Sequence, residues 1–236
     1  MHHDVTDPVL AVIGTLFAIL LGFMLANSMQ RFEGARSNLE QEAGAVGDIY
    51  RLVDGLPADI KSKTRRDCVN YTQSVVNEEW ALMQNGKSSD KAWASMNDIW
   101  HDCLHFQPNT QAEGDIHQML VAAVSKAGEC RRTRFAELKY GLPQTLWFIV
   151  IFGGLSTIGL TYFFAVTSFK LQVLMTSVIT MIVGLNIYML AGYDAPFSGD
   201  IALTAAPFES ALEVMTKTSK LTDAEPPPAL ESPQKK

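Results

Sequence analysis

The sequence predicts an all-α membrane protein with three transmembrane helices and a helical polar domain inserted between the first and the second. Two long stretches, residues 8–30 and 142–169, contain no charged residue, and Lys170 is the only charge between Lys139 and Asp194. Only 19% of the chain is charged, so the charges are concentrated in the remaining polar part. The formal net charge of −6 gives no support to a nucleic-acid partner.

The first predicted span covers residues 9–29 and follows a short external N-terminus, residues 1–8. A helix needs roughly 20 apolar residues to cross about 30 Å of hydrocarbon, and this stretch has that length. We interpret it as an uncleaved span because no Lys or Arg precedes it, whereas a signal peptide begins with basic residues. The second span is predicted at 143–166 and the third at 171–193, and the short connection around Lys170 makes them a helical hairpin.

The distribution of Lys and Arg predicts the orientation, because cytoplasmic loops carry an excess of both. None precedes the first span, whereas residues 30–141 hold several close to the spans: Arg31, Arg36, Lys126, Arg131, Arg132, Arg134 and Lys139. We therefore expect the N-terminus outside a bacterial inner membrane and residues 30–141 in the cytoplasm. The C-terminal segment 194–218 should share that side, followed by a Pro- and charge-rich tail, residues 219–236, that we expect to be disordered.

The polar domain has the periodicity of helices throughout. Apolar residues recur in steps of four and three from Leu39 to Val53, which is a heptad seam: Leu39, Ala43, Val46, Tyr50 and Val53. The first helix should therefore continue unbroken from the membrane to about Asp54. Three further helices are expected, from Pro57 to Asn85, from Ser88 or Ser89 to just before Pro108, and from about Gln111 to Tyr140.

Small residues recur every four positions in the first span, at Gly14, Ala18, Gly22 and Ala26. Such a ladder allows another helix to approach closely in a bilayer, where burial from water supplies no driving force. We expect it to be a helix-packing surface, either within the chain or between subunits.

Residues with catalytic or metal-binding chemistry are few. His101 and His105 are spaced to share a helix face, but no third ligand accompanies them, so surface or packing roles are favoured. The three cysteines, Cys68, Cys103 and Cys130, have no CxxC spacing and are expected to be reduced thiols. No nucleotide-binding loop or nucleophile motif is present. We expect no enzyme activity, no metal site and no cofactor.

Asp194 is the most informative single charge, because it lies at the inner end of the third span. Pro196, Phe197 and Gly199 follow it closely. This sequence predicts an ordered turn at the cytoplasmic end of the third span, rather than an irregular loop leaving the membrane.

Two segments resemble the bestrophin family. The first is Leu21-Gly22-Phe23 followed by Arg31-Phe32-Glu33-Gly34-Ala35-Arg36, and the second is Pro196-Phe197-Ser198-Gly199. The chain as a whole is more similar to a bacterial family described as bestrophin-like, over about residues 10–210. Its pattern is matched by Gly22-Phe23, Glu42-Ala43, Pro57, Tyr71, Glu79-Trp80, Pro143 with Trp147, and Asp194 with Pro196-Phe197 and Gly199.

Bestrophins are pentameric ion channels, mostly conducting anions, with an apolar neck on the pore helix. The resemblance implies that Thr15, Ile19 and Phe23 form this neck, although Thr15 is less apolar than the family pattern. It also implies a homo-oligomer, with a pentamer favoured, and the lipid bilayer and permeant ions as partners. The chain departs from bestrophins in having three spans instead of four. It also lacks the acidic run of their calcium clasp, so calcium gating is not expected.

Two functions are open at this point. The first is a homo-oligomeric ion channel whose pore is lined by the first helix. The alternative is a membrane-anchored scaffold or regulatory protein whose cytoplasmic helices bind a partner protein, with the heptad seam serving that partner.

Overall fold

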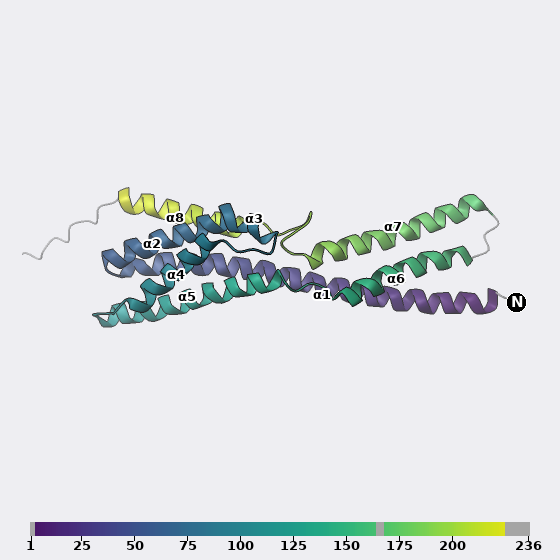
Figure 1. The fold of residues 1–236 in the computed structure, drawn as a ribbon, viewed down its shortest axis with the longest axis horizontal. Coiled ribbons are helices and arrows are strands. Elements are labelled where there is room, and N and C mark those ends of the chain that lie inside the picture. The colour runs from purple at the N-terminus through teal and green to yellow at the C-terminus, as the bar shows by residue number, and fades with distance from the viewer. Residues whose placement is uncertain (1–2, 164–167, 225–236) are drawn as a thin grey trace, which may run out of the picture. The chain divides into compact units, whose positions relative to one another are not determined.

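The structure is a computed structural model that describes residues 3–163 and 168–224 (Figure 1). In these ranges every regular element is a helix, which confirms the all-α fold class. The chain divides into two compact units. The apolar unit comprises Met1–Ser37 and Arg134–Leu203, and the polar unit comprises Asn38–Thr133 and Thr204–Lys236.

The first helix, α1, runs from His3 to Leu52 without a break and contributes to both units. It ends in a short 3-10 turn, Val53–Gly55, after which Leu56 is extended, with φ −109° and ψ 164°. A residue before proline is disfavoured in the helical region, so Pro57 forces the chain out of the helix at this point.

In the apolar unit α1 packs with α6, Gln144–Leu160, and α7, Phe169–Asp194 (Figure 1). Their shared core is a cluster of buried apolar side chains from all three helices: Leu21, Met24, Val150 and Leu190. A 3-10 turn, Thr161–Phe163, follows α6. Residues 164–167, which comprise the last three residues of the predicted second span and the first of its connection to the third, lie outside the described residues.

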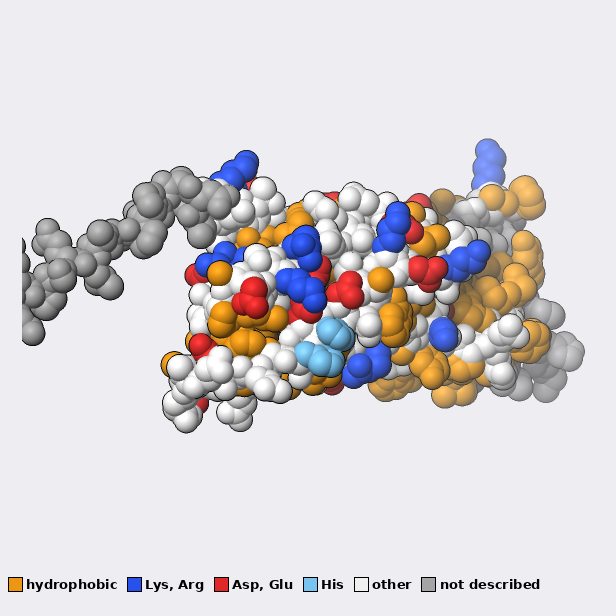
Figure 2. Space-filling view, turned by 60° about the vertical axis from the view of Figure 1, so that its left-hand side comes forward, with side chains coloured by type: hydrophobic (Ala, Val, Ile, Leu, Met, Phe, Trp, Pro, Cys, Tyr) orange, Lys and Arg blue, Asp and Glu red, His pale blue; other side chains and the backbone are white. Residues whose placement is uncertain are grey.

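Two helices of the described chain are long and apolar enough to cross a bilayer, Val12–Gly55 and Phe169–Asp194. The second span was expected at residues 143–166, but α6 has only 17 residues, so the count of three spans stays a prediction. Large apolar side chains such as Phe148 and Leu174 are exposed on α6 and α7, and Figure 2 shows a largely hydrophobic surface over this unit. An exposed apolar surface of this kind suits lipid rather than water.

The polar unit is built on the second half of α1. Around it lie α2, Ala58–Ser74; α3, Trp80–Met83; α4, Asp90–His105; α5, Gln111–Glu137; and α8, Ala206–Ala224. Ser89 caps α4, since its Oγ accepts a hydrogen bond from the Ala92 N–H at 3.3 Å. The heptad seam of α1 is at most 4% exposed at all five positions, so it forms the core of this unit.

The helix expected from Pro57 to Asn85 is interrupted by a π-helical segment, Val75–Glu79. A π segment inserts one residue into the turn and so changes the direction of the side chains that follow. Glu79 at its end is fully buried and accepts two hydrogen bonds from Arg131, both 2.6 Å long. We interpret the π segment as the adjustment that brings the Glu79 carboxylate to Arg131, a partner that local periodicity does not reveal.

A second difference from the sequence analysis is α8, which lies on α2 within the polar unit. Phe208 and Met215 on one side of it are buried, and the Phe208 and Trp80 rings lie 6.5 Å apart. The helix includes residues 219–224 of the expected disordered tail. Residues 225–236 of that tail lie outside the described part of the chain.

The pairing of Glu79 with Arg131 yields a test of stability. Glu79→Ala leaves a buried guanidinium without its carboxylate, and losing one partner of a buried ion pair costs about 3–5 kcal/mol. Glu78→Ala is the matched control, because Glu78 makes only a surface ion pair, 3.4 Å from Lys91, worth at most about 1 kcal/mol. Thermal unfolding in one detergent should separate the two variants clearly, and equal losses of stability would contradict the assignment.

Candidate functional site

Within the apolar unit α1 has one packed side. Leu21 and Met24 are buried on it, against Val150 of α6 and Leu190 of α7. Phe17, Leu20 and Leu25 surround this cluster and are partly buried. These side chains are spaced three and four residues apart, so they mark a single stripe along the helix.

The three expected neck residues do not belong to that core. Ile19 is 52% exposed and Phe23 is 72% exposed, and Thr15 is also exposed. They follow one another at intervals of four residues and therefore lie on one side of α1. In a single chain this side of the helix, at the depth of the predicted span, is left largely uncovered.

The ladder of small residues is also uncovered. A Cβ added to Gly14 or Gly22 would meet no atom of the described chain within 4 Å, and Ala18 and Ala26 are exposed. The close approach that the ladder permits is thus not made by any described residue of the same chain.

Close helix packing inside the chain occurs instead at Gly153 and Gly154 of α6. A Cβ on Gly153 would lie 2.4 Å from a ring carbon of Phe17, and one on Gly154 would lie 3.1 Å from Val183 of α7. These glycines let α1, α6 and α7 converge. The sequence analysis missed them, although two adjacent glycines in an apolar helix are a recognisable signal of close packing.

At the C-terminal end of α7, Asp194 accepts hydrogen bonds from three parts of the apolar unit. Its Oδ1 accepts from Arg31 Nη1 of α1 at 3.2 Å and from the Leu142 N–H at 2.7 Å. Its Oδ2 accepts from Trp147 Nε1 of α6 at 3.2 Å. Asp194 thus ties α1, the start of α6 and the end of α7 together, and we call these residues the Asp194 cluster.

Arg31 is the cation of this cluster. Besides Asp194 it donates a hydrogen bond to the Tyr140 carbonyl, and its Nη2 lies 3.8 Å from a Glu137 carboxylate oxygen. Arg31 and Asp194 are largely sheltered from solvent, with side chains 23% and 13% exposed. Screening by water is weaker at such a position, so the pair holds its partners more firmly than a surface ion pair does.

The turn after Asp194 has a defined shape. The Leu203 N–H donates to the Pro196 carbonyl at 2.8 Å, Pro196 and Phe197 are buried, and Gly199 has φ +91°, a conformation that favours glycine. Ile201 packs on the end of α7, where a Cβ on Gly192 would lie 2.6 Å from its side chain. Asp194, Pro196, Phe197 and Gly199, which the sequence analysis singled out, thus belong to an ordered turn after α7.

The residues with metal or redox chemistry lie apart from these features. Among the described residues no group of three or more His, Cys, Asp or Glu is arranged to hold a metal ion. His101 and His105 stack with ring centroids 4.0 Å apart and are exposed. The three cysteines are free and buried, and burial raises the pKa of the Cys103 thiol to about 11. A thiol with a raised pKa is a poor nucleophile at neutral pH.

The Asp194 cluster yields a second test. In Asp194→Asn the amide NH2 cannot accept the bonds that the carboxylate accepts, so the free energy of unfolding should fall by about 1.5–3 kcal/mol, as for bonds to a charged group. Asp200→Asn is the control, since exposed Asp200 accepts a single bond from Tyr188 at 3.0 Å. If thermal unfolding in detergent gave both variants the same midpoint, the clamping role of Asp194 would be wrong.

Comparison with known proteins assigns the family. The model of the Bestrophin-like domain matches residues 1–208. A bacterial bestrophin homolog from Klebsiella pneumoniae is similar in fold. Its D269A mutant gives a TM-score of 0.74 at 14% identity, covering 89% of this chain and 87% of that chain. Its structure from Zn-SAD phasing gives 0.64 at 17% identity, covering 93% and 88%. Among curated proteins, none matches this sequence. The family model covers most of the chain, and the protein therefore belongs to the bestrophin-like family.

Proposed function

We propose that this protein is a homo-oligomeric ion channel of the bacterial inner membrane, in which α1 of each subunit lines a central pore. The observation that carries the proposal is the uncovered side of α1. One side of the helix is packed on α6 and α7, while Ile19 and Phe23 remain more than half exposed. The bestrophin resemblance supplies the function, and it favours a pentamer.

A ring of subunits accounts for both uncovered features of α1. The ladder of Gly14, Ala18, Gly22 and Ala26 packs against a neighbouring subunit, because small residues let helix backbones approach closely in lipid. The neighbouring stripe of Thr15, Ile19 and Phe23 then faces the axis. In this ring one side of α1 packs within its own subunit, a second side contacts the neighbouring subunit, and a third side lines the pore.

The neck in this arrangement consists of apolar rings. Phe23 and Ile19 supply two of them, and a ring of this kind can gate by dewetting, since water and ions leave a narrow apolar constriction. Thr15 forms the outermost ring and is the most polar of the three.

Each subunit crosses the membrane three times in this proposal, with the N-terminus outside and the polar unit in the cytoplasm. The helix α6 and its 3-10 turn provide a continuous helical run from Gln144 to Phe163, which matches the roughly 20 residues that a span requires. The turn after Asp194 then lies at the inner mouth.

The scaffold alternative is less well supported, because the surface that it assigns to a partner protein is buried. It required the heptad seam of α1 to be available to a partner, but every seam position from Leu39 to Val53 is buried in the core of the polar unit. This burial favours the channel over the scaffold.

The first test of the channel is the mass of the protein in mild detergent. A ring of 26.0 kDa chains, five if the family pattern holds, is expected by native mass spectrometry. Gly22→Leu should shift the mass to the monomer, because Leu blocks the ladder between subunits, whereas a Cβ at this position meets no described atom of its own subunit within 4 Å. Gly159→Leu on α6 is the matched control, since its site is equally open within the subunit, and it should leave the ring intact.

A wild-type monomer or dimer would overturn the channel, because so few spans enclose no axis. If the ring persists in Gly22→Leu, the interface lies elsewhere on the subunit. Conductance measurements would then test whether the protein is a channel.

The second test concerns the neck. Phe23→Ala removes the largest exposed side chain of the stripe and should raise single-channel conductance several-fold in planar bilayers, by widening the constriction and weakening its dewetting. Phe152→Ala makes the same change at an exposed position of α6 and should leave conductance unchanged. Unchanged currents from assembled Phe23→Ala protein would remove Phe23 from the neck.

A further inference from the structure

The stripe of Thr15, Ile19 and Phe23 is followed on α1 by two amide side chains, Asn27 and Gln30, which also belong to the apolar unit. Each residue of an α-helix turns the chain by about 100°. Asn27 therefore lies about 40° to one side of Phe23, and Gln30 lies about 20° to the other side. The apolar stripe thus continues along the same side of the helix as a polar one.

The two amides have no partner in their own subunit. Both side chains are exposed, and no described residue forms a hydrogen bond with either of them. Asn27 lies within the first predicted span, residues 9–29, and Gln30 comes directly after it. An amide without a hydrogen-bond partner is costly in hydrocarbon, because nothing there replaces its hydration. These side chains therefore need water or a neighbouring subunit around them.

The amides of the other long apolar helix differ in this respect. In α7, Gln172 Nε2 donates to the Thr161 carbonyl at 2.8 Å. Asn186 Nδ2 donates to the Ile182 carbonyl, one turn earlier in the same helix, at 2.9 Å. Each of these amides is thus bonded within the chain, as a position in contact with lipid requires. The amides of α1 lack such bonds.

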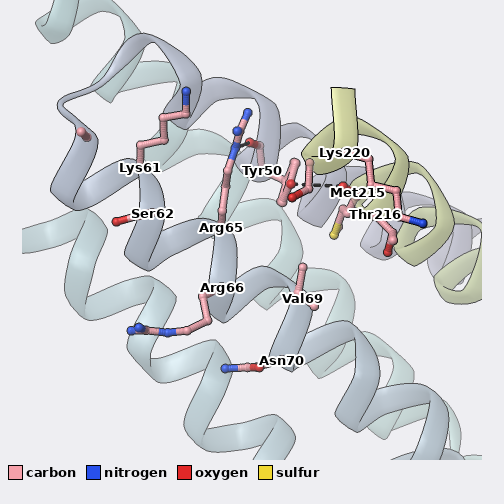
Figure 3. Close-up of a pocket in the computed structure, with 12 residues that line it drawn as sticks. Tyr50, Lys61, Ser62, Arg65, Arg66, Val69, Asn70, Met215, Thr216 and Lys220 are labelled. Carbon is pink, nitrogen blue, oxygen red and sulfur yellow. Dashed lines mark hydrogen bonds between the residues drawn. The ribbon is translucent and has the colours of Figure 1, made fainter. Parts of the chain in front are cut away.

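Polar side chains around an open cavity of the polar unit are bonded as well. Figure 3 shows this cavity, which α2 and α8 line, with Tyr50 of α1 at its wall. Arg65 Nε donates to the Tyr50 carbonyl at 3.2 Å, and the Tyr50 hydroxyl donates to the Met215 carbonyl at 3.1 Å. An open position does not by itself leave a polar side chain unpaired in this protein, so the two amides of α1 need an explanation of their own.

The charged residues closest in sequence to these amides lie on other sides of α1. Arg31 and Glu33 are each about 80° from Phe23 around the helix axis. Arg36 is about 140° away. Arg31 is also engaged with Asp194, which accepts its hydrogen bond at 3.2 Å. The side of the helix that carries the two amides is therefore polar but uncharged.

We propose that Asn27 and Gln30 form two neutral amide rings directly on the cytoplasmic side of the neck, where ions leaving the neck are solvated. The inference rests on the proposed channel, whose symmetry brings one copy of each side chain from every subunit to the axis. An amide offers its carbonyl oxygen to cations and its N–H groups to anions. The rings therefore favour neither sign of charge, and a charge placed there sets the selectivity.

The first test measures the reversal potential in planar bilayers under a salt gradient. Asn27→Asp should shift it toward the equilibrium potential of the cation, and Asn27→Lys should shift it toward that of the anion, because a charged ring attracts its counterion. The ratio of cation to anion permeability should change severalfold in each direction. Asn109→Asp is the control, since exposed Asn109 precedes α5 in the polar unit, and it should leave the reversal potential unchanged.

A second measurement does not depend on conduction. In proteoliposomes Asn27→Cys should react with a charged, membrane-impermeant methanethiosulfonate reagent, because the side chain faces water. Leu155→Cys places a thiol at an exposed position of apolar α6, and it should not react, because this position faces lipid. The three native thiols are buried, and the wild type measures their background: Cys68, Cys103 and Cys130.

Several outcomes would overturn the inference. Currents whose reversal potential stays unchanged, or shifts in the same direction with Asp and Lys, would remove Asn27 from the ion path and leave the channel intact. An unreactive Asn27→Cys would do the same whether or not the protein conducts. Dissociation of Asn27→Ala into monomers in native mass spectrometry would assign the amide to hydrogen bonds between subunits. No current from assembled wild-type protein would reject the channel itself, and this inference with it.

Discussion

The apolar unit depends on how one carboxylate is satisfied at the end of a membrane-type helix. Asp194 terminates α7, and three donors meet it there, from Arg31, from the Leu142 backbone and from the Trp147 indole. A carboxylate sheltered from water is tolerated only when such donors replace its hydration. The constraint fixes α1 at Arg31, the start of α6 and the end of α7 at once.

In the polar unit the buried charges are likewise satisfied by hydrogen-bonding partners, here in a buried ion pair. Glu79 and Arg131 are joined by two short hydrogen bonds, and Arg131 also donates to the hydroxyl of Tyr71 at 3.2 Å, which itself donates to buried Glu42. Each charge is acceptable because the network satisfies it, and the helix adopts a π segment to reach this arrangement. Specific polar contacts of this kind select one packing of the helices around the seam of α1.

With these contacts in place, α1 has different environments along its length. In the polar unit its apolar seam is enclosed by the chain's own helices, whereas in the apolar unit Ile19 and Phe23 are left exposed. An uncovered stripe beside an unused ladder of small residues is expected of a subunit that is completed by copies of itself. The proposed pore therefore follows from what a single chain leaves unpacked, together with the family to which the chain belongs.

The sequence by itself determined the features that depend on local pattern. Hydropathy and heptad spacing predicted the all-α class and the long first helix, and the Ser89 cap follows from residue type. Only the tertiary structure decided which side of α1 is covered, that Gly153 and Gly154 mediate the close contact, and that α8 packs on α2. The donors to Asp194 lie 47 to 163 residues away along the chain, and the partner of Glu79 lies 52 residues away. Periodicity reports the environment of a residue within a few turns of helix, whereas such pairings exist only once distant helices have packed.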